Sequence, residues 1–131
     1  MSSRARILLW SPVALLLAYE FYLSAQSTLP SLPGLDFPNV DKLQHTAYFF
    51  LTASFATRAA RFGEGWSPAR TRITLIAAAL IYGTLDEFHQ SFVPERAVQL
   101  GDVAADVFGA VLATLLAEPI WKAFRLDRTI R

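Results

Sequence analysis

Four apolar stretches of about twenty residues each, separated by short loops, constrain this chain more than any other feature. They cover residues 7–25, 41–60, 73–92 and 102–121 approximately. An α-helix needs roughly 20 residues to cross the hydrocarbon core of a bilayer. Proline and glycine gather in the connections 26–40 and 58–72, where they are expected to stop helices. The pattern predicts an all-α fold, an integral membrane bundle of four transmembrane helices that forms a single domain over residues 1–131.

The composition favours contact with lipid over contact with water. Of the 131 residues, 53% are hydrophobic and 18% are charged, whereas roughly 25% are charged in an average soluble domain. A soluble four-helix bundle is the alternative, and it requires a polar stripe along each helix. Residues 73–81 and 107–117 carry almost no polar side chain on any face of a helix. The soluble alternative therefore fits the sequence poorly.

The first apolar stretch has a second interpretation as a cleavable signal peptide, because it follows Arg4 and Arg6 and ends near Ala25. Leu23 stands where a cleavage site requires a small residue, and Glu20 is unusual so close to the end of such a segment. We therefore expect the stretch to be retained as the first membrane helix. Glu20 could join a polar cluster at this level of the membrane, but we interpret it rather as a residue that snorkels toward the interface or caps the helix.

The Lys and Arg residues predict how the helices are oriented. With four crossings, ten of the 12 fall on the side of the N-terminus, and only Lys42 and Arg96 fall on the other side. Cytoplasmic loops carry the excess of Lys and Arg in membrane proteins, so both termini are predicted to be cytoplasmic. The basic residues are divided among three short segments, and nucleic acid is not an expected partner. The chain has no cysteine, which excludes disulfides and thiolate metal ligands.

This topology brings polar residues from distant parts of the sequence to the external face of the membrane. Ionisable residues at membrane depth are costly, so they usually pair with one another and mark functional sites. Asp86 shares a helix face with His89 and Gln90, while Glu87 lies about 100° round the helix and can point elsewhere. The predicted site consists of Asp41, Lys42, His45, Asp86, Glu87, His89, Gln90, Arg96, Asp102 and Asp106.

These residues carry a resemblance to a known family. The segment 86–96 reads D-E-F-H-Q-S-F-V-P-E-R, the segment 41–45 reads D-K-L-Q-H, and Asp102, Asp106 and Gly109 follow. Over residues 36–117 the chain resembles the VanZ-like family of bacterial membrane proteins, in which Asn is as common as Asp at the position of Asp106. The resemblance implies a multi-pass protein of the bacterial cytoplasmic membrane and a role in the cell envelope. The family is named after a member associated with teicoplanin resistance, a form of antibiotic resistance.

Three hypotheses for the polar residues stay open at this point. The first is a structural network of salt bridges, which explains the excess of carboxylates over cations least well. The second is an enzyme, a hydrolase or transferase of a lipid head group. The third is binding without chemistry. The enzyme's substrate would be a lipid-linked cell-wall precursor or a phospholipid head group, whereas the binding site would hold a lipid or glycopeptide head group or help a partner protein. The lipid bilayer is the other expected partner.

Each hypothesis assigns roles to the same residues. The candidate catalytic residues are Asp86, His89, His45 and Asp102. The candidate substrate-binding residues are Lys42, Arg96, Gln90, Asp41, Glu87 and Asp106. Imidazole and carboxylate groups also suit a divalent metal ion, so the sequence leaves a metal cofactor open. Its candidate ligands are His45, Asp86, His89, Asp102 and Asp106.

Overall fold

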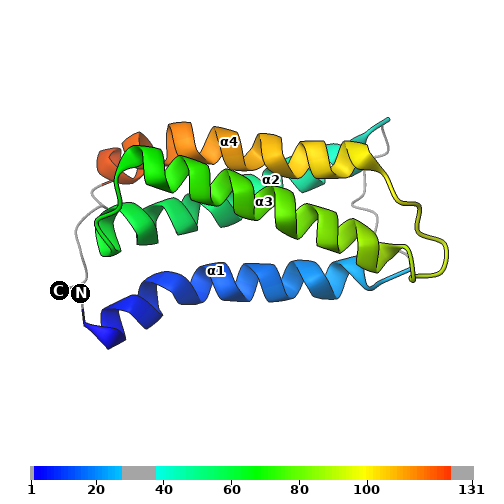
Figure 1. Cartoon of the computed structure of the whole chain (residues 1–131), viewed down its shortest axis with the longest axis horizontal. Coiled ribbons are helices and arrows are strands. Elements are labelled where there is room, and N and C mark those ends of the chain that lie inside the picture. Colours follow the sequence, from blue (N-terminus) through cyan, green and yellow to red (C-terminus); the bar gives the residue numbers. More distant parts are fainter. Residues whose placement is uncertain (1, 28–37, 125–131) are drawn as a thin grey trace.

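A computed structural model describes residues 2–27 and 38–124, and the regular secondary structure in this part of the chain is all helical, without strands. Helix α1 spans Ser3–Ser24, α2 spans Val40–Arg58 and continues as a π-helical turn η1 (Ala59–Gly63), α3 spans Pro68–Gln90 and α4 spans Leu100–Ala123. Consecutive helices run in opposite directions along the long axis of the molecule (Figure 1). The prediction of an all-α fold with four long helices is confirmed, one helix for each apolar stretch.

Two helix starts follow from serine caps. The Ser2 hydroxyl accepts a hydrogen bond from the Ala5 amide at 3.2 Å, and the Ser67 hydroxyl accepts one from the Arg70 amide at 3.2 Å. Pro68 was expected to break the chain between two helices, and this was wrong. Proline suits the first turn of a helix, where its missing N–H has no partner to lose, so α3 begins at Pro68 and five residues before the predicted start.

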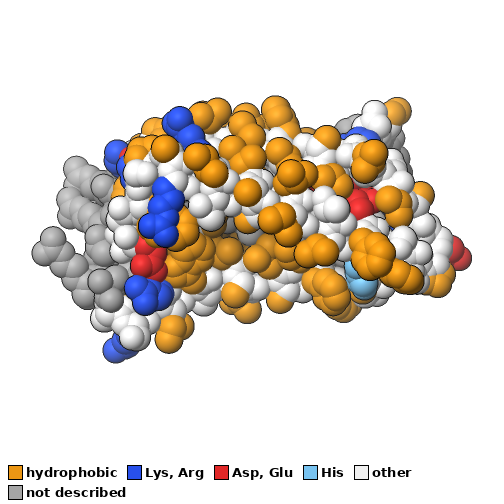
Figure 2. Space-filling model, viewed as in Figure 1, with side chains coloured by type: hydrophobic (Ala, Val, Ile, Leu, Met, Phe, Trp, Pro, Cys, Tyr) orange, Lys and Arg blue, Asp and Glu red, His pale blue; other side chains and the backbone are white. Residues whose placement is uncertain are grey.

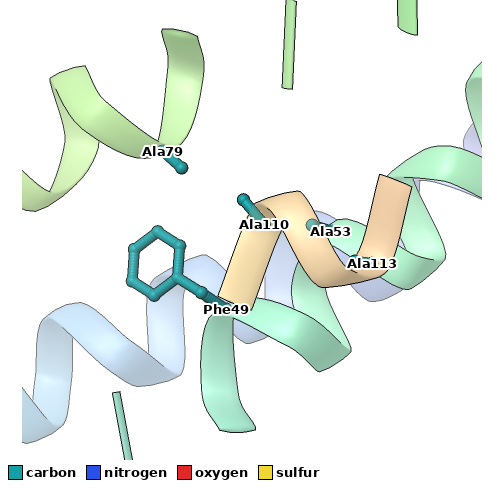
Figure 3. Close-up of a cluster of buried hydrophobic side chains, with 5 residues drawn as sticks. All are labelled: Phe49, Ala53, Ala79, Ala110 and Ala113. Carbon is teal, nitrogen blue, oxygen red and sulfur yellow. The ribbon is translucent and has the colours of Figure 1, made fainter. Parts of the chain in front are cut away.

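The buried core lies between α2, α3 and α4 and consists largely of alanine. Phe49 and Ala53 of α2 meet Ala79 of α3 and Ala110 and Ala113 of α4 (Figure 3). Small side chains allow helix backbones to approach closely, which is how membrane helices associate where the surrounding lipid is as apolar as the core. Helix α2 packs most extensively against α4.

Gly109 marks the closest approach of α4 to α2. A Cβ atom at this position would meet the carbonyl oxygen of Thr46 and would lie 2.9 Å from the amide nitrogen of Phe50. Both are backbone atoms, which cannot move aside as a side chain can. This crossing holds the first turns of α4 against the first turns of α2, and it therefore sets Asp106 level with His45.

Two tyrosines attach α1 to the other helices. The Tyr48 hydroxyl donates a hydrogen bond to the Leu16 carbonyl, and the Tyr82 hydroxyl donates one to the Leu17 carbonyl at 2.9 Å. Both acceptors lie in the middle of α1, one turn before Glu20. The last turns of α1 are thereby oriented with Glu20 directed toward α2 and α3, where it is buried.

Hydrophobic side chains cover the length of the visible face between the two ends of the bundle (Figure 2). Large apolar residues such as Leu15, Ile73, Ile81 and Phe108 are exposed. Helices α1 and α4 are long and apolar enough to cross a membrane. Helices α2 and α3 carry ionisable residues in their terminal turns, which lowers their mean hydropathy.

The end of the bundle that holds the N-terminus, here termed the N-terminal end, is fastened by ion pairs. Arg6 binds Glu64 at 2.7 Å, and Glu118 accepts from Arg61 at 2.7 Å and from Lys122 at 2.8 Å. Cationic side chains gather at this end in Figure 2. The orientation argument also counted Arg125, Arg128 and Arg131, which lie outside the described residues, as does the part 28–37 of the proline-rich loop.

Candidate functional site

The opposite end of the bundle, here termed the site end, is formed by the last turns of α1 and α3 and the first turns of α2 and α4 (Figure 1). All ten residues predicted from the sequence lie in these turns or in the loop between α3 and α4. Four acidic members, Asp86, Glu87, Asp102 and Asp106, are buried. The structure therefore places these residues at one end of the bundle, as the topology predicted, but their side chains have different partners.

Lys42 connects α2 to the start of α4. Its ammonium donates hydrogen bonds of 2.9 Å to Asp41, to the Gln99 side chain and to Asp102. Asp102 is buried, whereas Asp41 is partly exposed. This part of the cluster is the salt-bridge network that the structural hypothesis describes, and it uses all three donors of the ammonium group.

His45 lies one turn further along α2 and pairs with the deepest carboxylate. Its Nδ1 is 2.8 Å from Asp106 Oδ1, and its Nε2 is 3.9 Å from Asp102 Oδ2. Asp106 is only 2% exposed. Gly83 of α3 makes room for it, because a Cβ there would lie 2.5 Å from Asp106 Oδ2. The imidazole is thus held between two carboxylates of α4, one of which Lys42 neutralises.

Asp86 and Gln90 face the same interior from α3. The Gln90 amide donates a 2.7 Å hydrogen bond to Asp86 Oδ2. The other oxygen of this carboxylate, Oδ1, has no hydrogen-bond partner among the described residues although it is buried. A buried carboxylate oxygen without a donor is costly. Gln90 therefore orients the Asp86 carboxylate, and the second carboxylate oxygen remains available to a ligand.

Glu87 and His89 lie away from this group. Glu87 Oε2 accepts a 2.6 Å hydrogen bond from the backbone N–H of Gln99, so Glu87 holds the loop between α3 and α4 in place. The His89 ring stacks on Phe21 of α1 at 4.6 Å, and its Nδ1 is 3.4 Å from the Ser24 hydroxyl. The sequence placed His89 on one face with Asp86, and the structure turns its ring toward α1.

Glu20 of α1 belongs to the site, which corrects its interpretation as a snorkelling or capping residue. It is 8% exposed, and its Oε2 has no hydrogen-bond partner among the described residues. Ser24 and Gln44 were also not selected, and both contact the same space. The signal for Glu20 was present in the sequence, because it is the one charged residue of the stretch 7–25.

Two adjoining cavities open among these side chains. The inner cavity has a volume of about 80 Å³, and the outer cavity has a volume of about 310 Å³. Glu20, Asp86 and Tyr48 contribute to the inner one, while Asp41 and Asp102 contribute to the outer one. The two share Gln44, His45, Gln90 and Arg96. The two cavities therefore adjoin at His45 and Arg96, and the buried Glu20 and Asp86 line one of them.

Arg96 is the cation of both cavities. Its Nε is buried and has no hydrogen-bond partner among the described residues. An arginine at such a place has a planar set of donors that matches phosphate or carboxylate oxygens. The site end thus contains one guanidinium group with an unpartnered hydrogen-bond donor, and carboxylates with unpartnered acceptor oxygens.

Three side chains in this region have the arrangement of metal ligands. Glu20, His45 and Asp106 each present one ligand atom, and these atoms lie within 4.8 Å of one another. His45 and Asp106 belong to the ligand set expected from the sequence, whereas Glu20 does not. Asp86, Asp102 and His89 complete the expected set and lie outside this close group.

The fold and the site define an all-helical protein with a polar cavity at one end of an apolar bundle. A family model described as VanZ/LLP1 matches residues 4–122 of the 131-residue chain. The chain belongs to this family, and the resemblance inferred from the sequence is confirmed. No curated protein and no solved structure matches the chain. Family membership and the two apolar helices α1 and α4 indicate a membrane protein.

Proposed function

We propose that the protein crosses the bacterial cytoplasmic membrane four times, with both termini in the cytoplasm and the site end on the external side. Helices α2 and α3 each run antiparallel to their neighbours in the sequence, and they extend over a length similar to that of α1 and α4. The ion-paired N-terminal end carries most of the Lys and Arg residues, as the cytoplasmic side of a membrane protein does. Helix α1 stays part of the protein in this proposal, since it supplies Glu20 to the site.

Single cysteines test this topology without background, because the chain has none of its own. Ala97→Cys, in the loop at the site end, is expected to react with a membrane-impermeant maleimide in intact cells. Ala69→Cys, exposed in the first turn of α3, is expected to react only after the inner membrane is permeabilised. The reverse result would place the site in the cytoplasm and refute the proposed orientation.

We further propose that the site binds the head group of a lipid-linked envelope component, such as a cell-wall precursor. The observation that carries this is a surface-accessible polar cavity in which Arg96 and two buried carboxylic acids, Glu20 and Asp86, have unpartnered polar atoms. Arg96 would bind a phosphate group of the ligand. The carboxylates would accept hydrogen bonds from an ammonium or hydroxyl group. Such a head group fits the outer cavity, and its polar tip fits the inner one.

Binding by the purified protein in nanodiscs tests this proposal. A fluorescent lipid-linked cell-wall precursor is expected to bind in preference to phosphatidylglycerol carrying the same label. Arg96→Gln is expected to weaken binding by roughly tenfold or more, because it removes a charge-assisted bond in a partly desolvated site. Arg4→Gln is the matched control, since Arg4 is exposed at the N-terminal end. Equal losses in both variants would reduce the effect to general charge attraction and contradict the proposal.

A contribution to glycopeptide resistance is the corresponding function in the cell. The family, named after a member associated with teicoplanin resistance, supports this, and the external orientation proposed above would direct the site toward the compartment where glycopeptides act. Expression in a susceptible bacterium is expected to raise the teicoplanin concentration needed to inhibit growth, and Asp86→Asn is expected to abolish that rise. No rise with the wild-type protein at full expression would exclude the resistance function.

A hydrolase or transferase is the second candidate, favoured by the buried pair of His45 and Asp106. A histidine oriented by a carboxylate is the usual arrangement of a general base. Binding and catalysis separate in the Asp86→Asn variant. If this variant retains the lipid-linked ligand but no longer converts it, the site is catalytic. Absence of any conversion by the wild-type protein, with tight binding, would leave the binding function alone.

A further inference from the structure

We propose that Glu20 and His45, which line the inner cavity, bind one divalent transition-metal ion together with Asp106. The proposed ion would face the bound lipid head group, and this part of the inference rests on the proposed function. Three helices that are distant in sequence, α1, α2 and α4, each contribute one side chain to the group. One imidazole and two carboxylates form a mixed nitrogen and oxygen ligand set of the kind that suits zinc or manganese.

The first argument is charge balance. Lys42 is already bound to Asp41 and Asp102, so it cannot neutralise the inner carboxylates as well. Glu20, Asp86 and Asp106 are each at most 8% exposed, and Arg96 is the one permanent cation among the described residues that line the inner cavity. Buried charges require compensation. A divalent ion together with Arg96 would balance the three carboxylates.

The second argument is the unpartnered oxygens. Glu20 Oε2 and Asp86 Oδ1 are buried without a hydrogen-bond partner in the described part of the chain. Glu20 belongs to the close group, and Asp86 lines the same cavity. An ionised carboxylate oxygen can only accept a hydrogen bond, and a metal ion binds such an atom directly. The residue that the sequence interpretation left out thus has the clearest reason to be a ligand.

The third argument is the environment of His45. Its Nδ1 is 2.8 Å from Asp106 Oδ1, whereas two ligands of one tetrahedral zinc ion lie about 3.3 Å apart. Opening this pair by about 0.5 Å would admit the ion where a proton now lies between the two atoms. The other ring nitrogen, Nε2, faces Asp102 at 3.9 Å. A carboxylate behind a metal-bound histidine orients the ring and raises its basicity, and Lys42 in turn holds Asp102.

The inner cavity leaves space for a further ligand. Its volume of about 80 Å³ is enough for an ion with several waters. Asp86 and Arg96 line the same cavity, and Arg96 also lines the outer cavity, so a phosphate oxygen bound to Arg96 would lie near the ion. Three protein ligands with an open position are typical of a zinc site that acts on or binds a ligand, whereas a structural site is closed by four.

Metal content of the purified full-length protein tests the proposal. The protein is extracted in detergent, stripped with EDTA, incubated with Zn²⁺ or Mn²⁺ and desalted before elemental analysis. Wild type is expected to retain about one ion per chain, and Glu20→Gln and His45→Gln are expected to retain less than a tenth of that. Glu64→Gln, a carboxylate in the ion-paired N-terminal end, is the matched control and is expected to retain the full amount.

A variant that gains a spectroscopic signal shows that loss of metal in the other variants is not caused by unfolding. His45→Cys would replace the imidazole with the only thiol of the chain, which shifts the preference toward soft ions such as Cd²⁺. Cadmium bound at this thiolate is expected to give a sulfur-to-metal charge-transfer band that Glu20→Gln, added to His45→Cys, weakens. A folded wild type without metal, and a folded His45→Cys variant without the band, would overturn the proposal.

The outcome is independent of the proposed lipid function, because metal content is measured without lipid-linked ligand. Metal retained together with absence of head-group binding would refute only the proposed function. Head-group binding that persists in EDTA, with no metal in the wild type, would refute only the metal site.

Discussion

The two ends of the bundle use charged side chains in opposite ways. At the N-terminal end, Glu64 and Glu118 each have cationic partners at 2.7–2.8 Å, and Glu118 has two of them. At the site end, Glu20 and Asp86 are buried with an oxygen that has no partner among the described residues. Paired carboxylates fasten connections between helices, whereas unpaired buried carboxylates cost stability. The N-terminal end therefore fastens the helices to one another, whereas the unpartnered carboxylates of the site end are the feature on which the proposed ligand binding rests.

The largest effect is expected where the site end depends on a backbone contact. Gly109→Val would place a branched side chain against the backbone of Thr46 and Phe50. We expect a loss of about 3 kcal/mol or more in the free energy of unfolding, because backbone atoms cannot move aside. Thermal unfolding in detergent measures this. Ala104→Val is the control, since Ala104 is exposed on the same helix, and equal effects at both positions would refute the close helix contact.

The second prediction compares one lysine from each end. Lys42→Ala removes the cation of buried Asp102 and is expected to lower the free energy of unfolding clearly, since it leaves that carboxylate without its ammonium partner. Lys122→Ala is expected to cost less than about 0.5 kcal/mol, because its ammonium is exposed and Glu118 keeps Arg61. The measurement is again thermal unfolding of both variants. A smaller loss for Lys42→Ala than for Lys122→Ala would contradict the assignment of Lys42 as a structural residue.

The third prediction separates stability from binding at the site end. Asp86→Asn removes a buried negative charge that has an unpartnered oxygen, while the amide can still accept from Gln90. The free energy of unfolding is expected to stay the same or to rise by about 1 kcal/mol, and head-group binding is expected to fall. A combined loss of stability and binding would instead assign Asp86 to the structural network. Both readouts are obtained from one nanodisc preparation.

The smallest effect concerns pH at the N-terminal end. Hydrogen bonds from the Arg6 guanidinium hold the pKa of Glu64 below its ordinary value of 4.5. Because this pKa is lower in the folded state, the pair stabilises the fold above the unfolded-state value, and the contribution is lost as the pH falls through the folded-state value. Wild type is expected to unfold at a slightly higher temperature than Glu64→Gln at neutral pH. The difference should vanish in acid, and a difference independent of pH would contradict the role of this ion pair.

The sequence predicted the helices better than it predicted which helix faces meet one another. The lengths of the apolar stretches predicted four helices, and the alternating direction of the helices was enough to bring Asp41, Asp86 and Asp102 to one end. The start of α3 was misplaced because Pro68 was taken as a breaker, although the preceding Ser67 can cap a helix. A proline favours the first turn and opposes the interior, so its effect depends on which side of it the helix lies.

What the sequence by itself determined is the helical bundle, its polar end and the family to which the chain belongs. Only the tertiary structure decided that Glu20 joins His45 and Asp106, and that the His89 ring turns to α1. Helical periodicity shows which residues share a face of one helix, but it contains nothing about how that helix is rotated against its neighbours. That rotation is set by packing, here by Gly109 against the backbone of α2 and by tyrosine hydroxyls on α1.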